Sequence, residues 1–207
     1  YYAALEKPEG EAAEILTTLR REIAARTTGA QRPRVEIVGL GGPWQNAAMV
    51  YGLEATNGYN PLRIGAYDRL VSPGESPYIV QHRHFPASFP AYDSDLARVL
   101  GLEYVVLDRP IELMPHLARW RTRDVVMAGP RVWIYRLPAV APRVALAGSV
   151  RIADADIFID GGRYPTGLGS SEVMVDDDDD LRQTYAQVLR QPGRAEIVSW
   201  RPDRIEI

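Results

Sequence analysis

The sequence contains no cysteine, no long apolar run and no large surplus of charge of either sign. The absence of cysteine excludes disulfides, thiolate metal sites and cysteine nucleophiles. No segment approaches the roughly 18 consecutive apolar residues that a membrane-spanning helix needs. The net charge of −3 gives no general electrostatic reason to expect nucleic acid as a partner. Taken alone, the composition predicts a soluble globular polypeptide.

The length of 207 residues is enough for one domain with a substantial core. We predict a single domain over residues 1–207, with a sub-boundary near 138–150. The sequence starts at Tyr1 without a methionine and stops within an alternating segment, so we expect it to be excised from a longer protein.

Hydrophobic spacing and turn residues predict the secondary structure. Apolar residues at helical spacing indicate a helix over 11–26, and a glycine follows its end. Further helices are expected over 46–53, 67–70, 94–100 and 176–190, with Ser94 or Asp95 as an N-cap. Strands are expected over 34–39, 102–107, 124–127, 131–136, 144–147, 150–159, 195–200 and 204–207. The order predicts an α/β or α+β fold, with a mixed β-sheet flanked by short helices and β-hairpins toward the C-terminus.

Four short motifs follow one another in a fixed order. They are Gly58-Tyr-Asn-Pro61, Leu100-Gly-Leu-Glu-Tyr-Val-Val106, Trp133-Ile-Tyr-Arg-Leu-Pro138 and Pro142-Arg-Val-Ala-Leu146. In this order they resemble the YfhO-like membrane proteins, which are relatives of the GT-C glycosyltransferases, and the resemblance covers residues 34–207. The chain departs from the family at Arg136-Leu137, where the family prefers an acidic residue and asparagine.

The resemblance implies a location and partners. It implies a non-catalytic, extracytoplasmic (periplasmic) domain of an integral membrane protein that handles lipid-linked sugars or cell-envelope polymers. It also implies that the last strands, over residues 195–207, form the entry to a following β-rich domain. The implied partners are the membrane-embedded remainder of the same polypeptide and a glycan or lipid-linked sugar. Catalytic acids of the family lie in membrane loops, so the resemblance transfers no catalytic residue, and no cofactor or metal is expected.

The long irregular segment 72–93 is the best candidate binding site, because binding residues concentrate on long loops. It contains Tyr78, His82, Arg83, His84 and Tyr92. These side chains can stack on a sugar or a lipid head group, and the aromatic ones can equally pack against the sheet.

Two alternative functions remain open. The His82-x-His84 pair is a partial metal clamp that lacks a nearby third ligand, and it suggests a soluble metal-dependent enzyme that uses this loop. The other alternative is a protein-interaction module, which an exposed apolar patch near the C-terminal strand would favour.

The remaining motifs favour structural roles. The acidic run 176–180 is typical of a helix start. Asp154, Asp156 and Asp160 do not match a calcium loop, and we expect a strand with Asp154 and Asp156 on one side and a turn at Asp160-Gly-Gly. Gly39-Leu-Gly-Gly lacks the third glycine of a dinucleotide fingerprint.

Overall fold

The computed structural model describes residues 8–29, 31–41, 44, 46–56, 65–71, 92–114, 124–137, 140–160, 164, 172–175, 195–201 and 204–207. Its helices are α1 (Gly10–Arg26), α2 (Ala47–Tyr51), α3 (Gly65–Val71), α4 (Asp95–Val99), the 3-10 turn η2 (Ile111–Leu113) and α5 (Ala155–Asp160). Its strands are β1 (Arg34–Val38), β2 (Leu102–Leu107), β3 (Asp124–Ala128), β4 (Trp133–Arg136), β5 (Ser149–Ile152), β6 (Glu172–Val175), β7 (Ser199–Arg201) and β8 (Arg204–Glu206). The predicted α/β class is confirmed.

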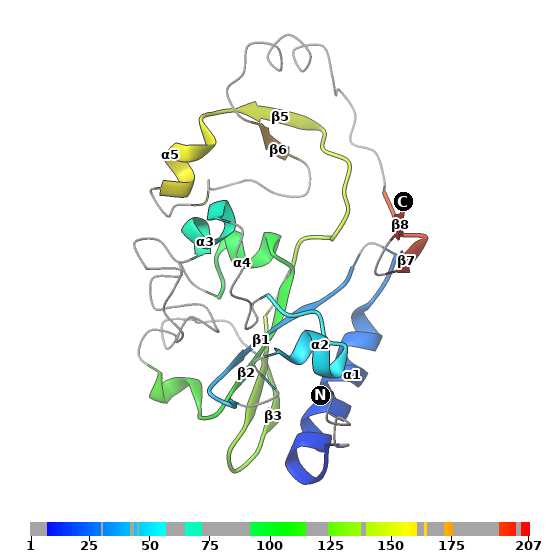
Figure 1. Cartoon of the computed structure of the whole chain (residues 1–207), viewed down its shortest axis with the longest axis vertical. Helices are drawn as coiled ribbons and strands as arrows, with labels where there is room; N and C mark the ends of the chain where they lie inside the picture. The colour runs from blue at the N-terminus through cyan, green and yellow to red at the C-terminus, as the bar shows by residue number, and fades with distance from the viewer. Residues whose placement is uncertain are drawn as a thin grey trace, which may run out of the picture.

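The main sheet has the strand order β1-β2-β4-β3 (Figure 1). β1 runs parallel to β2, whereas β4 is antiparallel to both β2 and β3, so the predicted mixed sheet is also confirmed. β2 is buried at all six positions, which agrees with its nearly continuous apolar sequence. The outer edge of β1 carries a parallel bridge between Val35 and Ala55.

Helices cover both faces of this sheet. α1 packs Ile15, Leu16 and Leu19 into a cluster that includes Tyr104 and Val106 of β2. The opposite cluster joins side chains of α3 and α4 to β2, and its members include Val71, Tyr92, Leu96, Val105 and Leu107. The alternation of side chains along β2 therefore serves two separate apolar clusters, one on each face.

The segment 94–101 shows why a short helix forms before β2. The Ser94 hydroxyl accepts a hydrogen bond from the Ala97 amide at 3.2 Å, so the predicted N-cap is confirmed. Gly101 has a φ of +72°, a left-handed conformation that glycine adopts without strain. The chain then enters β2 directly.

Two predicted strands differ from the structure. Residues 144–147 form no strand: they pair with none of the described strands, and Ala145 and Leu146 are exposed rather than packed on a sheet. The strand expected over 150–159 ends at Ile152, and α5 follows. The Asp154 carboxylate accepts a hydrogen bond from the Asp156 amide at 2.9 Å, which turns the chain into this helix. Asp156 and Asp160 then share one helical face, where Arg69 of α3 reaches Asp160 at 2.6 Å and Asp156 at 3.4 Å.

The hairpin predicted at the C-terminus is present as β7–β8, in which Trp200 pairs with Ile205. Several other predictions lie outside the described residues, among them the helix at 176–190 and the turn motif Gly58-Tyr-Asn-Pro61. In the described part of the chain, no helix combines the length and the hydrophobicity needed to cross a bilayer.

Candidate functional site

Tyr92 is the one predicted site residue that the structure places. Tyr78, His82, Arg83 and His84 lie outside the described residues. The Tyr92 side chain is 2% exposed and belongs to the core cluster under α3 and α4. Burial, and secondarily the Glu36 carboxylate, raise the pKa of its hydroxyl well above the usual value. Tyr92 therefore packs on the sheet, which is the structural role that the sequence left open.

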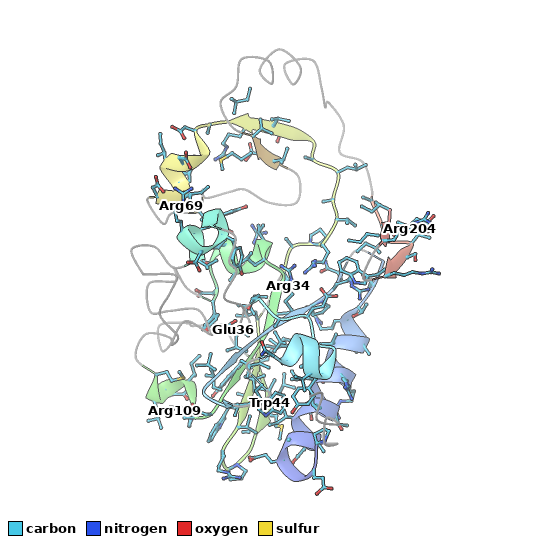
Figure 2. All side chains as sticks on the ribbon, viewed as in Figure 1. Arg34, Glu36, Trp44, Arg69, Arg109 and Arg204 are labelled. Atoms are coloured by element: carbon cyan, nitrogen blue, oxygen red, sulfur yellow. The ribbon has the colours of Figure 1, made fainter. Side chains whose placement is uncertain are left out.

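Glu36 is a buried carboxylate in the middle of the molecule (Figure 2). The Thr56 hydroxyl donates a hydrogen bond to its Oε2 atom at 2.5 Å. The Tyr67 hydroxyl in turn donates to the Thr56 carbonyl oxygen at 2.9 Å. These contacts connect β1 to the segment after α2 and to α3. A buried carboxylate bonded in this way is typical of a structural polar network.

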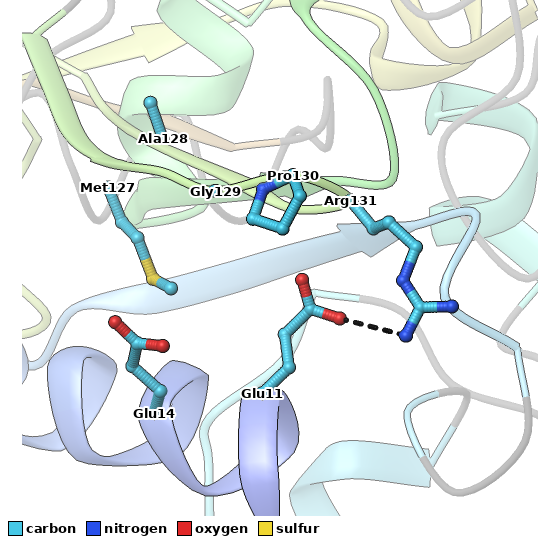
Figure 3. Close-up of a pocket in the computed structure, with 7 residues that line it drawn as sticks. All are labelled: Glu11, Glu14, Met127, Ala128, Gly129, Pro130 and Arg131. Atoms are coloured by element: carbon cyan, nitrogen blue, oxygen red, sulfur yellow. Dashed lines mark ion pairs between the residues drawn. The ribbon is translucent and has the colours of Figure 1, made fainter.

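An open cleft in the described structure lies between the first turns of α1 and the turn that joins β3 to β4. Its volume is about 490 Å³. It is lined by Glu11, Glu14, Met127, Ala128, Gly129, Pro130 and Arg131 (Figure 3). Figure 3 shows both glutamate side chains rising from α1 toward the turn, and Met127 pointing down toward Glu14.

Local structure fixes the charged groups of this cleft. Glu11 and Glu14 are three residues apart on α1, so both project from the same face of the helix. Arg131 lies in the turn, and its Nη2 atom is 3.4 Å from Oε2 of Glu11. The turn is closed by the Gly129 amide, which donates to the Val132 carbonyl oxygen at 2.8 Å. A helix and a hydrogen-bonded turn therefore hold the two sides of the cleft.

The Oε1 atom of Glu11 is buried and has no hydrogen-bond partner among the described residues. A buried acceptor without a donor is costly, and a ligand hydroxyl or amine in the cleft would satisfy it. Glu14 is exposed, and the Arg131 side chain is 83% exposed. The cleft thus offers two carboxylates, one guanidinium group and the apolar side chain of Met127 to a small polar ligand.

Sequence reasoning missed this cleft. The spacing of Glu11 and Glu14 indicated only the polar face of a helix, and the turn 128–130 indicated only a hairpin. No local sequence pattern predicts that this turn lies over the start of α1. The described residues contain no group of three His, Asp or Glu side chains placed to hold a metal ion.

A second cluster of charged side chains lies near the other end of α1, beside the C-terminal hairpin. The guanidinium carbon of Arg32 lies 4.3 Å from the centre of the Trp200 ring, and that of Arg143 lies 5.4 Å from it. The Ile197 amide also donates to the Gly29 carbonyl oxygen. These contacts fasten the hairpin to the main α/β unit.

Comparison of the chain with protein-family models, curated proteins and solved structures finds no match.

Proposed function

We propose that this chain is a non-catalytic, extracytoplasmic domain of a YfhO-like, GT-C-related membrane protein. In this proposal the cleft between α1 and the β3–β4 turn holds a sugar unit of a glycan or lipid-linked sugar. The cleft is the observation that carries the binding role, and the order of the sequence motifs supports the family and the location. The partners are then the membrane-embedded remainder of the polypeptide and the glycan.

The chemistry of the cleft suits a saccharide. Its volume of about 490 Å³ falls within the range of about 300–1,000 Å³ that is typical of small-molecule sites. Carboxylate oxygens of Glu11 and Glu14 can accept hydrogen bonds from sugar hydroxyls, and Arg131 can donate to ring or hydroxyl oxygens. The thioether side chain of Met127 offers an adaptable apolar surface for the C–H groups of the sugar.

The placement of the carboxylates supports holding rather than cleavage. Most glycoside hydrolases place two carboxyl groups on either side of the bond that breaks. Here Glu11 and Glu14 project side by side from one helical face. A bound sugar would meet both of them from the same side, an arrangement suited to positioning it.

Saccharide titration of the isotopically labelled chain tests the binding role. Glucose, N-acetylglucosamine and their β-linked disaccharides are the probes, and the amide NMR signals of residues 127–131 are the readout. We expect selective shifts for at least one probe, and a loss of these shifts in Glu14→Gln, whose exposed side chain has little effect on folding. Glu206→Gln removes the same charge in the hairpin β7–β8 and should bind as the parent does. Shifts that persist unchanged in Glu14→Gln, or no shifts with any probe, would contradict the binding role.

The proposed location has a separate test. The intact open reading frame should encode several hydrophobic spans outside this chain, and the tagged full-length product should sediment with membranes. A full-length product that begins near Tyr1 and remains in the supernatant would remove the family assignment. It would leave the saccharide result standing on its own.

The C-terminal hairpin favours a second candidate function, that of a protein-interaction module. The register that pairs Trp200 with Ile205 places Val198 and Ile207 on the same face as this pair. Val198, Ile205 and Ile207 are 77%, 50% and 68% exposed. A two-stranded hairpin with one apolar face is marginally stable by itself, so a β-rich neighbour that packs on this face would stabilise it.

The interaction role is tested by the variant Ile205→Asp, with Ile157→Asp as a control. Ile157 is 68% exposed on α5, which lies on the opposite side of the view in Figure 1 from β7 and β8. In the full-length protein we expect Ile205→Asp to increase proteolytic cleavage near residues 195–207, because the neighbouring module no longer covers the hairpin. Equal cleavage in the two variants would argue against an interface at the hairpin.

A further inference from the structure

A concentration of positive charge lies where α1 ends and β1 begins. The Glu54 carboxylate lies among these charges, where it accepts from Nε of Arg32 at 2.8 Å and lies 3.3 Å from Nη2 of Arg143. One negative charge is therefore shared by two guanidinium groups. Because these side chains are only 27%, 28% and 13% exposed for Arg32, Glu54 and Arg143, water screens the remaining charge incompletely.

Two further arginines at this place are held by neutral groups. Arg34 donates from Nη1 to the Leu100 carbonyl oxygen at 2.9 Å, and Arg20 donates from Nη2 to the Tyr51 carbonyl oxygen at 3.0 Å. A carbonyl oxygen fixes the direction of a guanidinium group without cancelling its charge. The cluster of Arg20, Arg32, Arg34 and Arg143 thus keeps an excess of positive charge, in a chain whose net charge is −3.

A second carboxylate at this end does not remove the excess. Glu196 packs against Gly29, just after α1, where a side chain at position 29 would touch its Cβ atom at 3.4 Å. Among the described residues here, four guanidinium groups are accompanied by two carboxylates, Glu54 and Glu196. The cluster is consequently complementary to an anion that carries up to two negative charges.

The neighbouring arginines affect the pKa of Arg143. Burial lowers the pKa of its guanidinium group, and the neighbouring charges of Arg34 and Arg32 lower it further, against the opposite effect of Glu54. Its Nη1 atom is buried next to Gly101, and no group in the described part of the chain accepts a hydrogen bond from it. The cluster therefore contains both excess charge and an unmet donor.

A cleft gives a ligand access to the cluster. Its volume is about 180 Å³, and it is lined by Arg20, Ile23, Ala24, Thr27, Arg32, Pro33, Gly52, Leu53 and Glu54. Arg20 comes from α1 and Arg32 from the segment before β1, so two guanidinium groups from different elements border the same small space. Arginine forks match the tetrahedral oxygens of a phosphate, to which they can donate paired hydrogen bonds.

We propose that the cleft between Arg20 and Arg32 is a phosphate-binding site, with Arg34 and Arg143 adding positive charge close to its Glu54 wall. This site lies toward the C-terminal end of α1, whereas the saccharide cleft lies at its N-terminal end, so the proposal does not rest on the proposed function. The shared chemistry is a phosphate group, whether free, on a sugar or in a lipid head group.

The first experiment titrates the labelled chain with inorganic phosphate and, separately, with glucose 1-phosphate, at constant ionic strength maintained with sodium chloride. The readouts are the amide signals of residues 20, 27, 32 and 53 and the dissociation constant. The variant Arg20→Gln removes an exposed guanidinium group without breaking an ion pair. Its matched control is Arg21→Gln, one residue along α1, whose side chain is 69% exposed and does not line the cleft.

We expect phosphate, but not chloride, to shift these signals in the parent chain. Loss of one charge-assisted contact should weaken binding by about tenfold or more in Arg20→Gln, and Arg21→Gln should stay within about twofold of the parent. Arg32→Gln should weaken binding as well, with retained amide dispersion as the check that it folds. Equal binding by Arg20→Gln and Arg21→Gln would overturn the proposal, because phosphate affinity would then depend on the total charge and not on a contact with Arg20.

A second arm distinguishes the sources of the phosphate. Phosphatidylcholine vesicles with and without phosphatidylglycerol are sedimented with the parent chain and with Arg20→Gln. Sedimentation that requires phosphatidylglycerol and is lost in Arg20→Gln assigns the site to a lipid head group. Binding confined to phosphate or glucose 1-phosphate assigns it to a soluble phosphate. An absence of binding in every arm overturns the proposal.

Discussion

The carboxylate of Asp108 occupies the space that a side chain at Gly39 would need. A Cβ atom at Gly39 would lie 2.3 Å from Cγ of Asp108, and Gly39 has a φ of +85°. Both residues directly follow the parallel strands β1 and β2. Arg109 donates two hydrogen bonds to this carboxylate, both at 2.8 Å. They hold the carboxylate in place and lower the pKa of Asp108. The chain can therefore leave β1 here only through a glycine.

Gly39→Ala should lower the free energy of unfolding by about 2 kcal/mol or more, because left-handed strain and displacement of Asp108 add together. Gly41→Ala is the matched control. Gly41 also has a positive φ, +63°, but no atom of the described residues lies within 4 Å of its Cβ position. Gly41→Ala should lower the free energy of unfolding by only about 1 kcal/mol. Denaturant unfolding measures both, and equal losses would mean that Asp108 moves aside freely.

Tyr104→Phe should leave the protein equally stable or more stable by up to about 1 kcal/mol. The Tyr104 side chain is fully buried on β2, and its hydroxyl has no hydrogen-bond partner in the ranges that the structure describes, so the variant removes an unsatisfied polar atom. Tyr135→Phe is the comparison, because the Tyr135 hydroxyl accepts from the Ile111 amide at 3.1 Å. That variant should lose about 1 kcal/mol. A loss in Tyr104→Phe as large as that in Tyr135→Phe would show that the Tyr104 hydroxyl has a partner.

The stability contributed by Glu103 should fall as the pH rises. Glu103 is buried in β2, and burial raises its pKa above the ordinary value of 4.5, although the ion pair with Arg26 opposes this shift. Below pH 4.5 both folded and unfolded chains hold the proton. Above it the unfolded chain releases the proton first, so unfolding becomes more favourable until the pH passes the folded pKa.

The variant Glu103→Gln isolates this effect. From pH 4.5 upward, the parent should lose stability relative to Glu103→Gln. The difference between their free energies of unfolding should grow with pH and then level off. Arg26→Gln should make the parent's decline steeper, since it removes the charge that favours ionised Glu103. A difference that is flat between pH 4 and 7 would contradict the raised pKa.

Trp200→Ala should release the hairpin β7–β8 without unfolding the main sheet. The guanidinium groups of Arg32 and Arg143 lie over the ring of Trp200. Such cation–π contacts contribute roughly 0.5–2 kcal/mol to stability. Hydrogen exchange of the Val198 amide, which donates to the Glu206 carbonyl oxygen at 2.8 Å, should accelerate severalfold. Trp200→Phe should retain part of the protection. Faster exchange in β2 as well would indicate global destabilisation.

Local sequence rules predicted the parts of the fold that local chemistry determines. Ser94 caps α4 through its own hydroxyl, and the unbroken apolar run of β2 identifies a strand covered on both faces. α5 was missed because Ile157 and Ile159 favour a strand in isolation. Its helical form instead places Asp156 and Asp160 where Arg69 reaches both, which is a tertiary contact.

Both candidate sites needed the folded structure to be found. Glu11 and Arg131 meet only because the β3–β4 turn reaches the start of α1. Arg20, Arg32 and Arg143 come from three separate segments that gather around Glu54. Such long-range encounters leave no periodic signal in the sequence. The predicted loop residues His82 and His84 lie outside the described part of the chain, so their role stays a prediction.

The position of β2 between the two apolar clusters has a consequence for how the chain folds. Neither cluster is complete until β2 has paired with β1, and these strands are joined by the whole segment from α2 to α4. The chain must lose the conformational entropy of closing that long loop before the burial of either cluster can compensate for it. We expect a single slow folding phase, in which Val105→Ala and Val106→Ala retard folding alike although their side chains face opposite clusters. Packing on the two faces of the sheet would then be established in one kinetic event.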